Sequence, residues 1–408
     1  MIPRHLAATL RRTAGGFPVL SVTGPRQSGK TTLLRNLFPN LGYVSLEQPD
    51  ERRFATEDPR GFLRHHSDAG VILDEVQHAP DLFSYIQVAV DEDSTPGRFI
   101  LSGSQNFLLM ARISQSLAGR VYVSNLLPFS LAELAGRQSA TVAGLLAGPA
   151  AATGPGRTTG IAASLDGPWL AHAVRGFYPP VHDRNLAPQD WFPGYFQTYL
   201  QRDVRDLTQV GDLESFSRFV MLCAGRAGQI LNLSSLGNDC GISHDTARRW
   251  LSVLETSFVV FRLQPHHRNF NKRLIKSPKL YFVDTGLLCW LLQVRDENQL
   301  ARHPLRGAVF ENMMIAEALK TSYHSGELPR LHFWRDHRGN EIDLVVDTPD
   351  GAHPVEIKSG ETIRTDLFKG LAYWGSLAGQ RLPATLIYGG EESSTRNGVD
   401  VRAWRHWL

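Results

Sequence analysis

The sequence predicts an α/β protein of several domains whose first third forms a parallel sheet covered by helices on both faces. Three observations carry this prediction. Short apolar segments alternate with helical patterns over the first third of the chain. The first apolar segment ends in a glycine-rich loop that opens a helix. With 408 residues, the chain is also too long for one ordinary hydrophobic core.

The predicted strands are short apolar segments, and the predicted helices lie between them. We expect strands at residues 19–23, 42–46, 70–74 and 98–101, and helices at residues 30–37, 59–65 and 82–90. Strands that alternate with helices in this way run parallel, and ligands bind at the carboxyl ends of such strands. Functional residues are therefore expected directly after the strands.

A phosphate-binding loop is predicted directly after the first strand. Residues 24–31 read Gly-Pro-Arg-Gln-Ser-Gly-Lys-Thr, which matches the spacing G-x-x-x-x-G-K-[ST] between a strand and a helix. In such a loop, backbone N–H groups and the helix N-terminus attract phosphate oxygens. Lys30 is placed to reach the β- and γ-phosphates, and the Thr31 hydroxyl to bind Mg²⁺. The predicted ligands are ATP and Mg²⁺, and the predicted nucleotide-binding residues are Gly24, Gln27, Ser28, Gly29, Lys30, Thr31 and Thr32.

Residues for ATP hydrolysis are predicted at the ends of the third and fourth strands. Asp74 and Glu75 follow an apolar run, so Asp74 is expected to hold Mg²⁺, directly or through water. Glu75 is expected to orient and activate the attacking water. Ser104 is expected to sense the γ-phosphate if the fourth strand lies between the first and third. Gln105 and Asn106 are alternatives for that role, and a plain polar turn is another interpretation.

An arginine that completes a neighbouring subunit's site is also predicted. Arg120 precedes a further predicted strand at residues 121–123, from which it would project as an arginine finger. Arg112 is the alternative for this role. A solvated basic side chain is the simpler interpretation of either residue.

These motifs together resemble AAA+-type ATPases over roughly residues 1–210. The resemblance is strongest to a prokaryotic group in which an AAA ATPase is fused to a C-terminal domain of unknown function. Further stretches typical of that group are residues 45–47, 58–59, 103–104, 117–120, 127–130 and 199–204. The resemblance implies a RecA-like core, a short helical lid and a homo-oligomer, with a hexameric ring as the expected form. No lid arginine of the usual AAA+ kind stands out in the sequence, and Arg202 and Arg205 are the candidates for it.

The domain boundaries are predicted from changes in composition. Residues 136–167 are rich in Ala, Gly, Thr and Ser and are typical of a flexible insertion, with a short helix at 141–146. A further helix is expected from Pro188 onward. The predicted order is a P-loop ATPase core (1–137), an insertion or linker (138–168), a helical lid (169–213), a winged helix (214–268) and a nuclease-like domain (269–408).

A winged helix is predicted from the helix–turn–helix rhythm of residues 231–251. Ser234 is expected to cap the first helix, Gly241 to supply the turn, and Ser243 to cap the second helix. A wing strand is expected at residues 258–263.

The outer surface of this second helix and the basic segment after the wing strand are expected to contact DNA. A structural or protein-docking winged helix, with its arginines facing solvent, is the alternative. The predicted DNA-binding residues are His244, Thr246, Arg248, Arg249, Lys272 and Arg273.

A pair of strands joined by a tight turn is predicted at residues 341–347 and 354–358. The period of two along a strand puts Glu356 and Lys358 on one face and Ile357 on the other. Two carboxylates and a lysine arranged in this way can bind Mg²⁺ and prepare water to attack a phosphodiester.

The acids of this segment resemble those of the PD-(D/E)xK nuclease superfamily over roughly residues 300–375. Asp343, Glu356 and Lys358 match the D…E-x-K positions, and Glu311 matches the helical acid. The resemblance implies a restriction-endonuclease-like α/β fold with a metal site at these four residues. A charged hairpin, or a degenerate fold kept for binding, is the alternative.

Composition narrows the remaining choices. The formal net charge of +3 permits a nucleic-acid partner without requiring one. Cys223, Cys240 and Cys289 lack metal-ligand spacing and are expected to be buried. The sequence shows neither a signal core nor an apolar run of membrane-spanning length, so a cytoplasmic protein without a membrane partner is expected.

The sequence as a whole predicts an oligomeric ATPase that hydrolyses ATP and acts on DNA, with branched DNA suggested by analogy alone. Two alternatives stay open. One is a regulatory nucleotide switch that binds a protein partner, and the other is a metal-dependent nuclease that ATP licenses.

Overall fold

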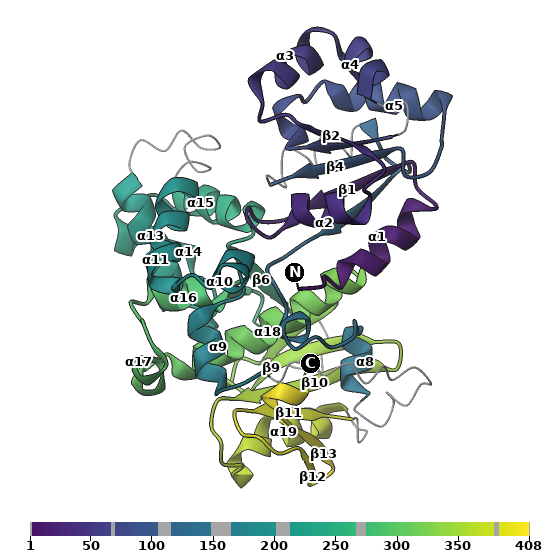
Figure 1. The fold of residues 1–408 in the computed structure, drawn as a ribbon. Helices are drawn as coiled ribbons and strands as arrows, with labels where there is room; N and C mark the ends of the chain where they lie inside the picture. Colours follow the sequence, from purple (N-terminus) through teal and green to yellow (C-terminus); the bar gives the residue numbers. More distant parts are fainter. Residues whose placement is uncertain are drawn as a thin grey trace. The chain divides into compact units, whose positions relative to one another are not determined.

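Strands and helices alternate through the first part of the computed structural model (Figure 1), as the sequence predicts. The structure describes residues 2–66, 70–104, 116–147, 165–200, 213–266, 275–378 and 383–407. The chain divides into two compact units. The first unit comprises Met1–Phe129, Thr256–Phe258 and Tyr323–Glu327, and the second comprises Ser130–Glu255, Val259–Ser322 and Leu328–Leu408.

The first unit contains a five-stranded parallel sheet in the order β2-β3-β4-β1-β5. Strand β4 lies between β3 and β1, which is the strand order that the predicted role of Ser104 requires. Ser104 directly follows β4, so it lies between the phosphate loop after β1 and the acidic pair at the end of β3. The strands are β1 (Val19–Thr23), β2 (Gly42–Ser45), β3 (Val71–Asp74), β4 (Phe99–Gly103) and β5 (Val121–Asn125).

Helices cover both faces of this sheet, because the strands are apolar on both sides. Val19 packs in one buried cluster with Phe62 and Phe83, whereas its neighbour Leu20 packs in another cluster with Leu34. The described helices of this unit are α1 (Leu6–Ala14), α2 (Lys30–Leu37), α3 (Pro49–Glu57), α4 (Pro59–His66), the 3-10 turn η1 (Val76–His78) and α5 (Leu82–Glu92). The expected parallel, helix-covered sheet is confirmed, and the observed bounds lie within two residues of the predicted ones.

The second unit is built on an eight-stranded mixed sheet in the order β12-β13-β11-β10-β9-β8-β6-β7. Strand β6 pairs antiparallel with β7 and parallel with β8, so the predicted wing strand and the C-terminal strands belong to one sheet. The strands are β6 (Val260–Pro265), β7 (Lys279–Phe282), β8 (Leu331–Arg335), β9 (Glu341–Thr348), β10 (Gly351–Lys358), β11 (Thr385–Tyr388), β12 (Ser394–Arg396) and β13 (Val399–Ala403).

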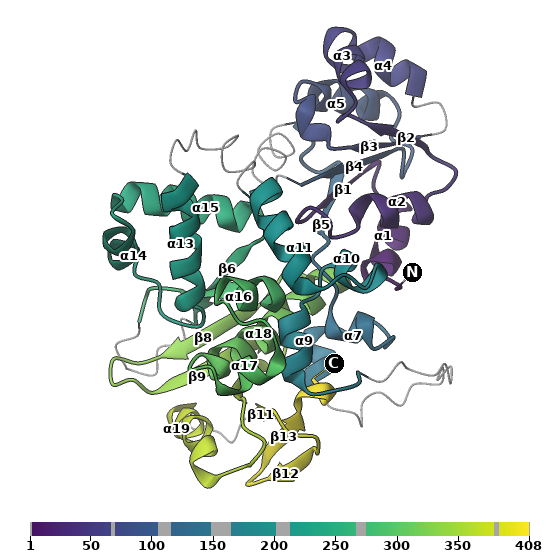
Figure 2. The same ribbon diagram turned by 60° about the vertical axis from the view of Figure 1, so that its left-hand side comes forward.

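Many short helices surround this sheet (Figure 2). Those described are α7 (Leu131–Leu134), α8 (Val142–Leu146), α9 (Trp169–Arg175), α10 (Pro179–Asp183), α11 (Pro188–Tyr195), the π-helical turn η3 (Phe196–Leu200), α13 (Leu213–Gly225), α14 (Leu233–Cys240), α15 (His244–Thr256), α16 (Thr285–Leu291), α17 (Glu297–Arg302), α18 (Arg306–Ser325), η4 (Thr365–Phe368), α19 (Lys369–Ala378) and η5 (Trp404–His406). Over the described ranges, no helix combines the length and apolar character needed to cross a membrane.

The helix–turn–helix segment forms as α14, a turn at Gly241 and α15, with one correction to its caps. Gly241 adopts φ +72°, and the Ser243 hydroxyl accepts a hydrogen bond from the Thr246 amide at 3.1 Å, as predicted. The predicted cap at Ser234 is wrong. Helix α14 begins earlier, and the side chain of Asn232 accepts the Ser235 amide at 3.0 Å, which is the contact that defines an N-cap.

The two compact units do not test the predicted domain boundaries at residues 137, 168, 213 and 268. Residues 148–164 of the predicted insertion and residues 267–274 after the wing strand lie outside the described residues. The predicted helix in the insertion is present as α8. The three cysteines are buried and free, as expected.

Candidate functional site

The phosphate loop joins β1 to α2 through two glycines that no other residue replaces without strain. Gly24 adopts φ +149° and Gly29 φ +93°, both unfavourable for residues with a Cβ. The ammonium of Lys30 donates hydrogen bonds of 2.9 Å to the carbonyls of Gly24 and Pro25. The lysine is thereby held at the loop where phosphate oxygens would bind.

Asp74 is brought to the start of α2, as a shared Mg²⁺ site requires. The Thr31 hydroxyl donates to Asp74 Oδ2 at 2.7 Å, and the Tyr43 hydroxyl donates to the same oxygen at 2.9 Å. Ser102 donates to the other carboxylate oxygen. Burial, together with the charge of Asp74, raises the pKa of Tyr43 to about 12, so this phenol stays a donor at neutral pH. Tyr43 and Ser102 were not predicted, since each reaches the site from a different strand.

Glu75 directly follows β3 and has a left-handed conformation, with φ +53°. Its Oε2 atom accepts three hydrogen bonds: from Gln77 Nε2 at 2.5 Å, from Ser104 Oγ at 3.0 Å and from the Ser104 amide at 3.3 Å. Arg26 Nε of the phosphate loop donates to Ser104 Oγ at 3.3 Å. The structure therefore brings together Glu75 and Ser104, and adds Gln77 and Arg26, which sequence reasoning missed.

Arg4 supports the phosphate loop from the N-terminal segment. Its guanidinium donates to the carbonyl of Ser28 at 2.7 Å and to that of Leu127 at 2.6 Å, and it lies over the ring of Phe129. Arg4 is buried. This role has no signal in the sequence, because nothing local distinguishes Arg4, which precedes α1, from the basic residues within that helix.

Arg120 lies at the start of β5 and forms an ion pair within its own unit. Its Nε and Nη2 atoms contact the Asp91 carboxylate at 2.5 and 3.0 Å, and about a third of its side chain is exposed. The alternative residues for the γ-phosphate and arginine-finger roles, Gln105, Asn106 and Arg112, lie outside the described residues, as do Arg202 and Arg205.

The outer face of α15 is basic and exposed. His244, Arg248 and Arg249 are exposed, and Thr246 is half-buried. Arg248 contacts the Asp245 carboxylate at 3.5 Å, and Arg249 donates to the Thr246 hydroxyl at 3.4 Å. Lys272 and Arg273 lie outside the described residues.

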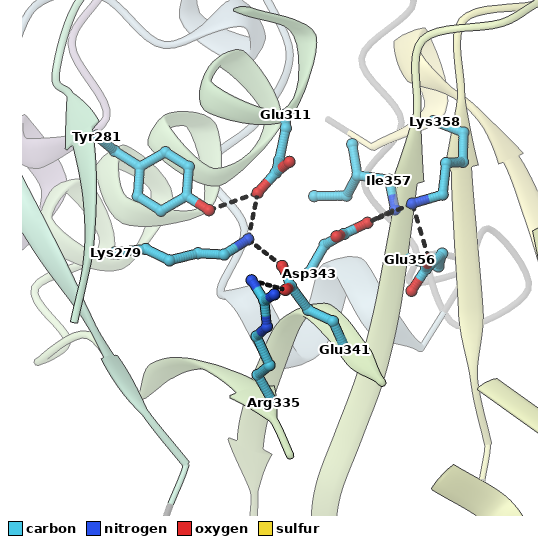
Figure 3. Close-up of polar contacts among 9 residues, drawn as sticks. All are labelled: Lys279, Tyr281, Glu311, Arg335, Glu341, Asp343, Glu356, Ile357 and Lys358. Atoms are coloured by element: carbon cyan, nitrogen blue, oxygen red, sulfur yellow. Dashed lines mark hydrogen bonds and ion pairs between the residues drawn. The ribbon is translucent and has the colours of Figure 1, made fainter. Parts of the chain in front are cut away.

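A buried cluster of acids and lysines occupies the C-terminal sheet (Figure 3). On one side, Lys279 on β7 contacts Glu311 Oε1 at 3.0 Å and also contacts Glu341. Tyr281 donates to Glu311 Oε1 at 2.5 Å, and Arg335 contacts Glu341 at 3.1 Å. Only 3 % of the Lys279 side chain is exposed, so the acids, and not water, compensate its charge.

The other side of this cluster contains the predicted nuclease-like residues. Lys358 Nζ contacts Asp343 Oδ2 at 2.9 Å and Glu356 Oε1 at 2.7 Å. The amide of Ile357 donates to Asp343 Oδ2 at 2.8 Å. Glu356 and Lys358 thus share one face of β10, and Asp343 of β9 converges with them, as predicted.

The charges of this cluster shift one another's pKa values. Burial and the nearby Asp343 raise the pKa of Glu356 to about 8, and the same two causes raise that of Glu311. Burial lowers the pKa of Lys279 and of Lys358, but the surrounding carboxylates raise it more, so both lysines stay charged.

The contacts of this cluster do not fit a divalent cation. Over the described ranges, no three Asp, Glu, His or Cys side chains are grouped so as to hold a metal ion. Two ammonium groups already lie among the carboxylates, and a cation would have to displace one of them. The metal assignment of Glu311, Asp343, Glu356 and Lys358 therefore stays a prediction that these contacts do not support.

The geometry of the first unit defines a P-loop ATPase, and comparison with known families agrees. Residues 16–135 match the family described as AAA domain. Residues 168–298 match a domain of unknown function (DUF8612), and residues 306–406 match a second domain of unknown function (DUF4143).

The chain belongs to the same family as two uncharacterized mycobacterial proteins, Mb2031c of Mycobacterium bovis and Rv2008c of Mycobacterium tuberculosis. Each is 34 % identical to it over 364 residues, which cover 88 % of this chain and 74 % of the relative.

Two solved structures show weaker likeness. The Walker-type ATPase PABY2304 of Pyrococcus abyssi has a TM-score of 0.41 at 14 % identity and covers 72 % of this chain and 96 % of its own. RuvB of Thermotoga maritima has a TM-score of 0.26 at 17 % identity, with coverages of 63 % and 86 %. Neither likeness is close enough to bear on the assignment.

Proposed function

We propose that this protein hydrolyses ATP at the phosphate loop and uses that reaction to act on DNA. The observation that carries the ATPase part is the contact of 2.7 Å between the Thr31 hydroxyl and Asp74, with Glu75 directly beside it. These oxygens belong to the residue types that hold Mg²⁺ and activate water in phosphoryl transfer.

The residues of the site divide the hydrolysis among them. Thr31 and Asp74 would hold Mg²⁺, which when bound would offset the negative charge of the phosphate groups. Lys30 would exchange its two loop carbonyls for β- and γ-phosphate oxygens. Glu75 would accept a proton from water as the water oxygen bonds to the γ-phosphorus and the bond to the β–γ bridging oxygen breaks. Ser104, between Glu75 and Arg26, would report the γ-phosphate.

The proposed contact with DNA is made by α15. His244, Arg248 and Arg249 lie on the exposed face of the second helix of a helix–turn–helix, the helix that enters the major groove in proteins of this class. Thr246 lies on the same turn and its amide is fixed by the Ser243 cap. The side chains closest to the N-terminus of α15 are therefore the ones proposed to contact bases and phosphates.

We also propose that the protein works as a homo-oligomer in which Arg120 reaches a neighbouring nucleotide site. The pair that Arg120 makes with Asp91 is partly exposed. Such pairs contribute at most about 1 kcal/mol, so a γ-phosphate in the next subunit would compete for the arginine readily.

The proposed function is tested by steady-state ATPase rates with single-stranded, duplex and four-way-junction DNA, for the wild type and for Glu75→Gln. We expect one DNA form to stimulate the wild type, and Glu75→Gln to be inactive with every DNA. A Glu75→Gln protein as active as the wild type would refute the assignment of the site. A rate that no DNA changes would refute the DNA role and favour a nucleotide switch that binds a protein.

A charge reversal on α15 tests the DNA surface separately. Arg249→Glu should weaken DNA binding and reduce its dependence on salt concentration, because one phosphate contact is lost. Arg218→Glu is the matched control, since Arg218 lies on α13 in an exposed pair with Glu214. Equal binding by both variants would argue against α15 as the DNA surface. Cleavage of the DNA that disappears in Lys358→Ala would instead identify a nuclease.

A further inference from the structure

Gln77 is held against the carboxylate of Glu75 by a short hydrogen bond. It lies in η1, directly after β3, and its Nε2 atom is 2.5 Å from Glu75 Oε2. A carboxylate only accepts hydrogen bonds, so the amide nitrogen of Gln77 must face it. That orientation turns Gln77 Oε1 into a buried position where, within the described part of the chain, it has no hydrogen-bond partner.

Two unfavourable features therefore meet at this contact. Glu75 has the left-handed backbone that residues with a Cβ avoid, and Gln77 has a buried acceptor without a donor. Such features persist where the surrounding structure holds a side chain in a working position. Both features occur at the one contact that brings the amide of Gln77 to Glu75 Oε2.

The carboxylate of Glu75 is therefore held in place through only one of its two oxygens. Gln77 holds Oε2 from the β3 side, and the hydroxyl and amide of Ser104 hold it from the β4 side. Among the described residues, none hydrogen-bonds to Glu75 Oε1. The hydrogen bonds to Oε2 restrict the rotation of the carboxylate and keep Oε1 available for a water molecule.

We propose that Gln77 is a positioning residue for ATP hydrolysis. By holding Glu75 Oε2, it keeps Oε1 directed at the attacking water, an inference that rests on the hydrolysis proposed above. Ser104 has a second partner in Arg26 of the phosphate loop and responds to the γ-phosphate, whereas Gln77 belongs to the same short turn as Glu75. Of the two residues that hold Glu75, Gln77 is thus the one that keeps its hydrogen bond when nucleotide binds.

The test compares kcat and KM for ATP in the wild type, Gln77→Ala, Gln77→Glu and Glu75→Gln, with Gln87→Ala on α5 as the matched control. We expect Gln77→Ala to lower kcat about 10- to 100-fold with KM unchanged, because a hydrogen bond to a charged group is lost. Gln77→Glu keeps the side-chain shape but replaces the donor with a second acid. It should lower kcat at least as far, whereas Gln87→Ala should behave like the wild type.

Binding of a fluorescent ATP analogue checks that each variant keeps an intact nucleotide site. If Gln77→Ala no longer binds the analogue, kcat and KM of Gln77→Glu alone test the role of Gln77. A wild-type kcat in the deciding variant, or a raised KM with kcat unchanged, overturns the role of Gln77. An active Glu75→Gln would overturn the proposed ATPase site itself, so the two failures are distinguishable.

Discussion

Replacing Gly24 by alanine is the sharpest test of the phosphate loop, because the structure leaves no space for a Cβ there. An ideal Cβ would lie 2.1 Å from the carbonyl oxygen of Leu126, far inside van der Waals contact. Leu126 cannot withdraw easily. Its amide donates to the Thr23 carbonyl at 2.8 Å, and the next carbonyl, of Leu127, accepts Arg4 at 2.6 Å.

The expected cost of Gly24→Ala has two parts. A backbone conformation that only glycine adopts easily costs about 1–3 kcal/mol, and overpacking costs about 1–3 kcal/mol more. The loop can relieve the clash only by moving the Gly24 carbonyl, which also holds Lys30. We expect about 3 kcal/mol of this cost to fall on the phosphate-binding form of the loop. That lowers ATP affinity on the order of 100-fold, because every 1.4 kcal/mol is about a factor of ten.

Fluorescence anisotropy with a labelled ATP analogue measures this loss, and thermal melting shows whether the fold survives. Gly119→Ala is the matched control. Gly119 also has a positive φ, +77°, but a Cβ there would meet nothing within 4 Å. It should therefore cost about 1–2 kcal/mol of stability and leave ATP affinity unchanged. If Gly24→Ala binds the analogue as tightly as Gly119→Ala, the steric argument for the loop is wrong.

Two further predictions concern the second unit. Lys279→Met should destabilise the protein by about 3–5 kcal/mol in urea, because Glu311 and Glu341 lose their buried counter-charge; adding Glu311→Gln should recover part of this, and an unchanged unfolding midpoint in Lys279→Met would contradict the charge argument. Burial, reinforced by Arg402, lowers the pKa of His353 to about 4, so its contribution to stability is complete above pH 6.5 and is lost as the pH falls toward 4. Between pH 7 and pH 4, His353→Gln should lose about 3 kcal/mol less unfolding free energy than the wild type. Urea titrations at the two pH values measure this, and an equal loss in both proteins would disprove the prediction.

The sequence by itself determined those elements of this protein whose structure depends on residues adjacent in the chain. Strand β1 and helix α2 have the predicted bounds, because the apolar run and the Lys30–Leu37 pattern are local signals. The phosphate loop lies between them for the same reason. The alternation of Glu356 and Lys358 on one face of β10 likewise follows from strand periodicity.

Local signals failed where two nearby residues competed for one role. Ser234 and Asn232 are both good N-caps by residue type, and the choice between them depends on where the packed helix begins. In the folded unit α14 begins at Leu233, and Asn232 is its N-cap. The sequence carries no local signal that separates the two.

The tertiary structure alone decided which distant residues meet. Lys279 and Glu311 are 32 positions apart, and the pairing of β7 with β6 places the lysine beside the acids of α18 and β9. Ser104 reaches Glu75 because β4 lies beside β3. The order of strands in a sheet depends on which apolar faces bury one another, a property of the whole core that no short stretch of sequence encodes. The sequence by itself determined the chemistry available to this protein, and the packing of the sheet determined which groups carry it out together.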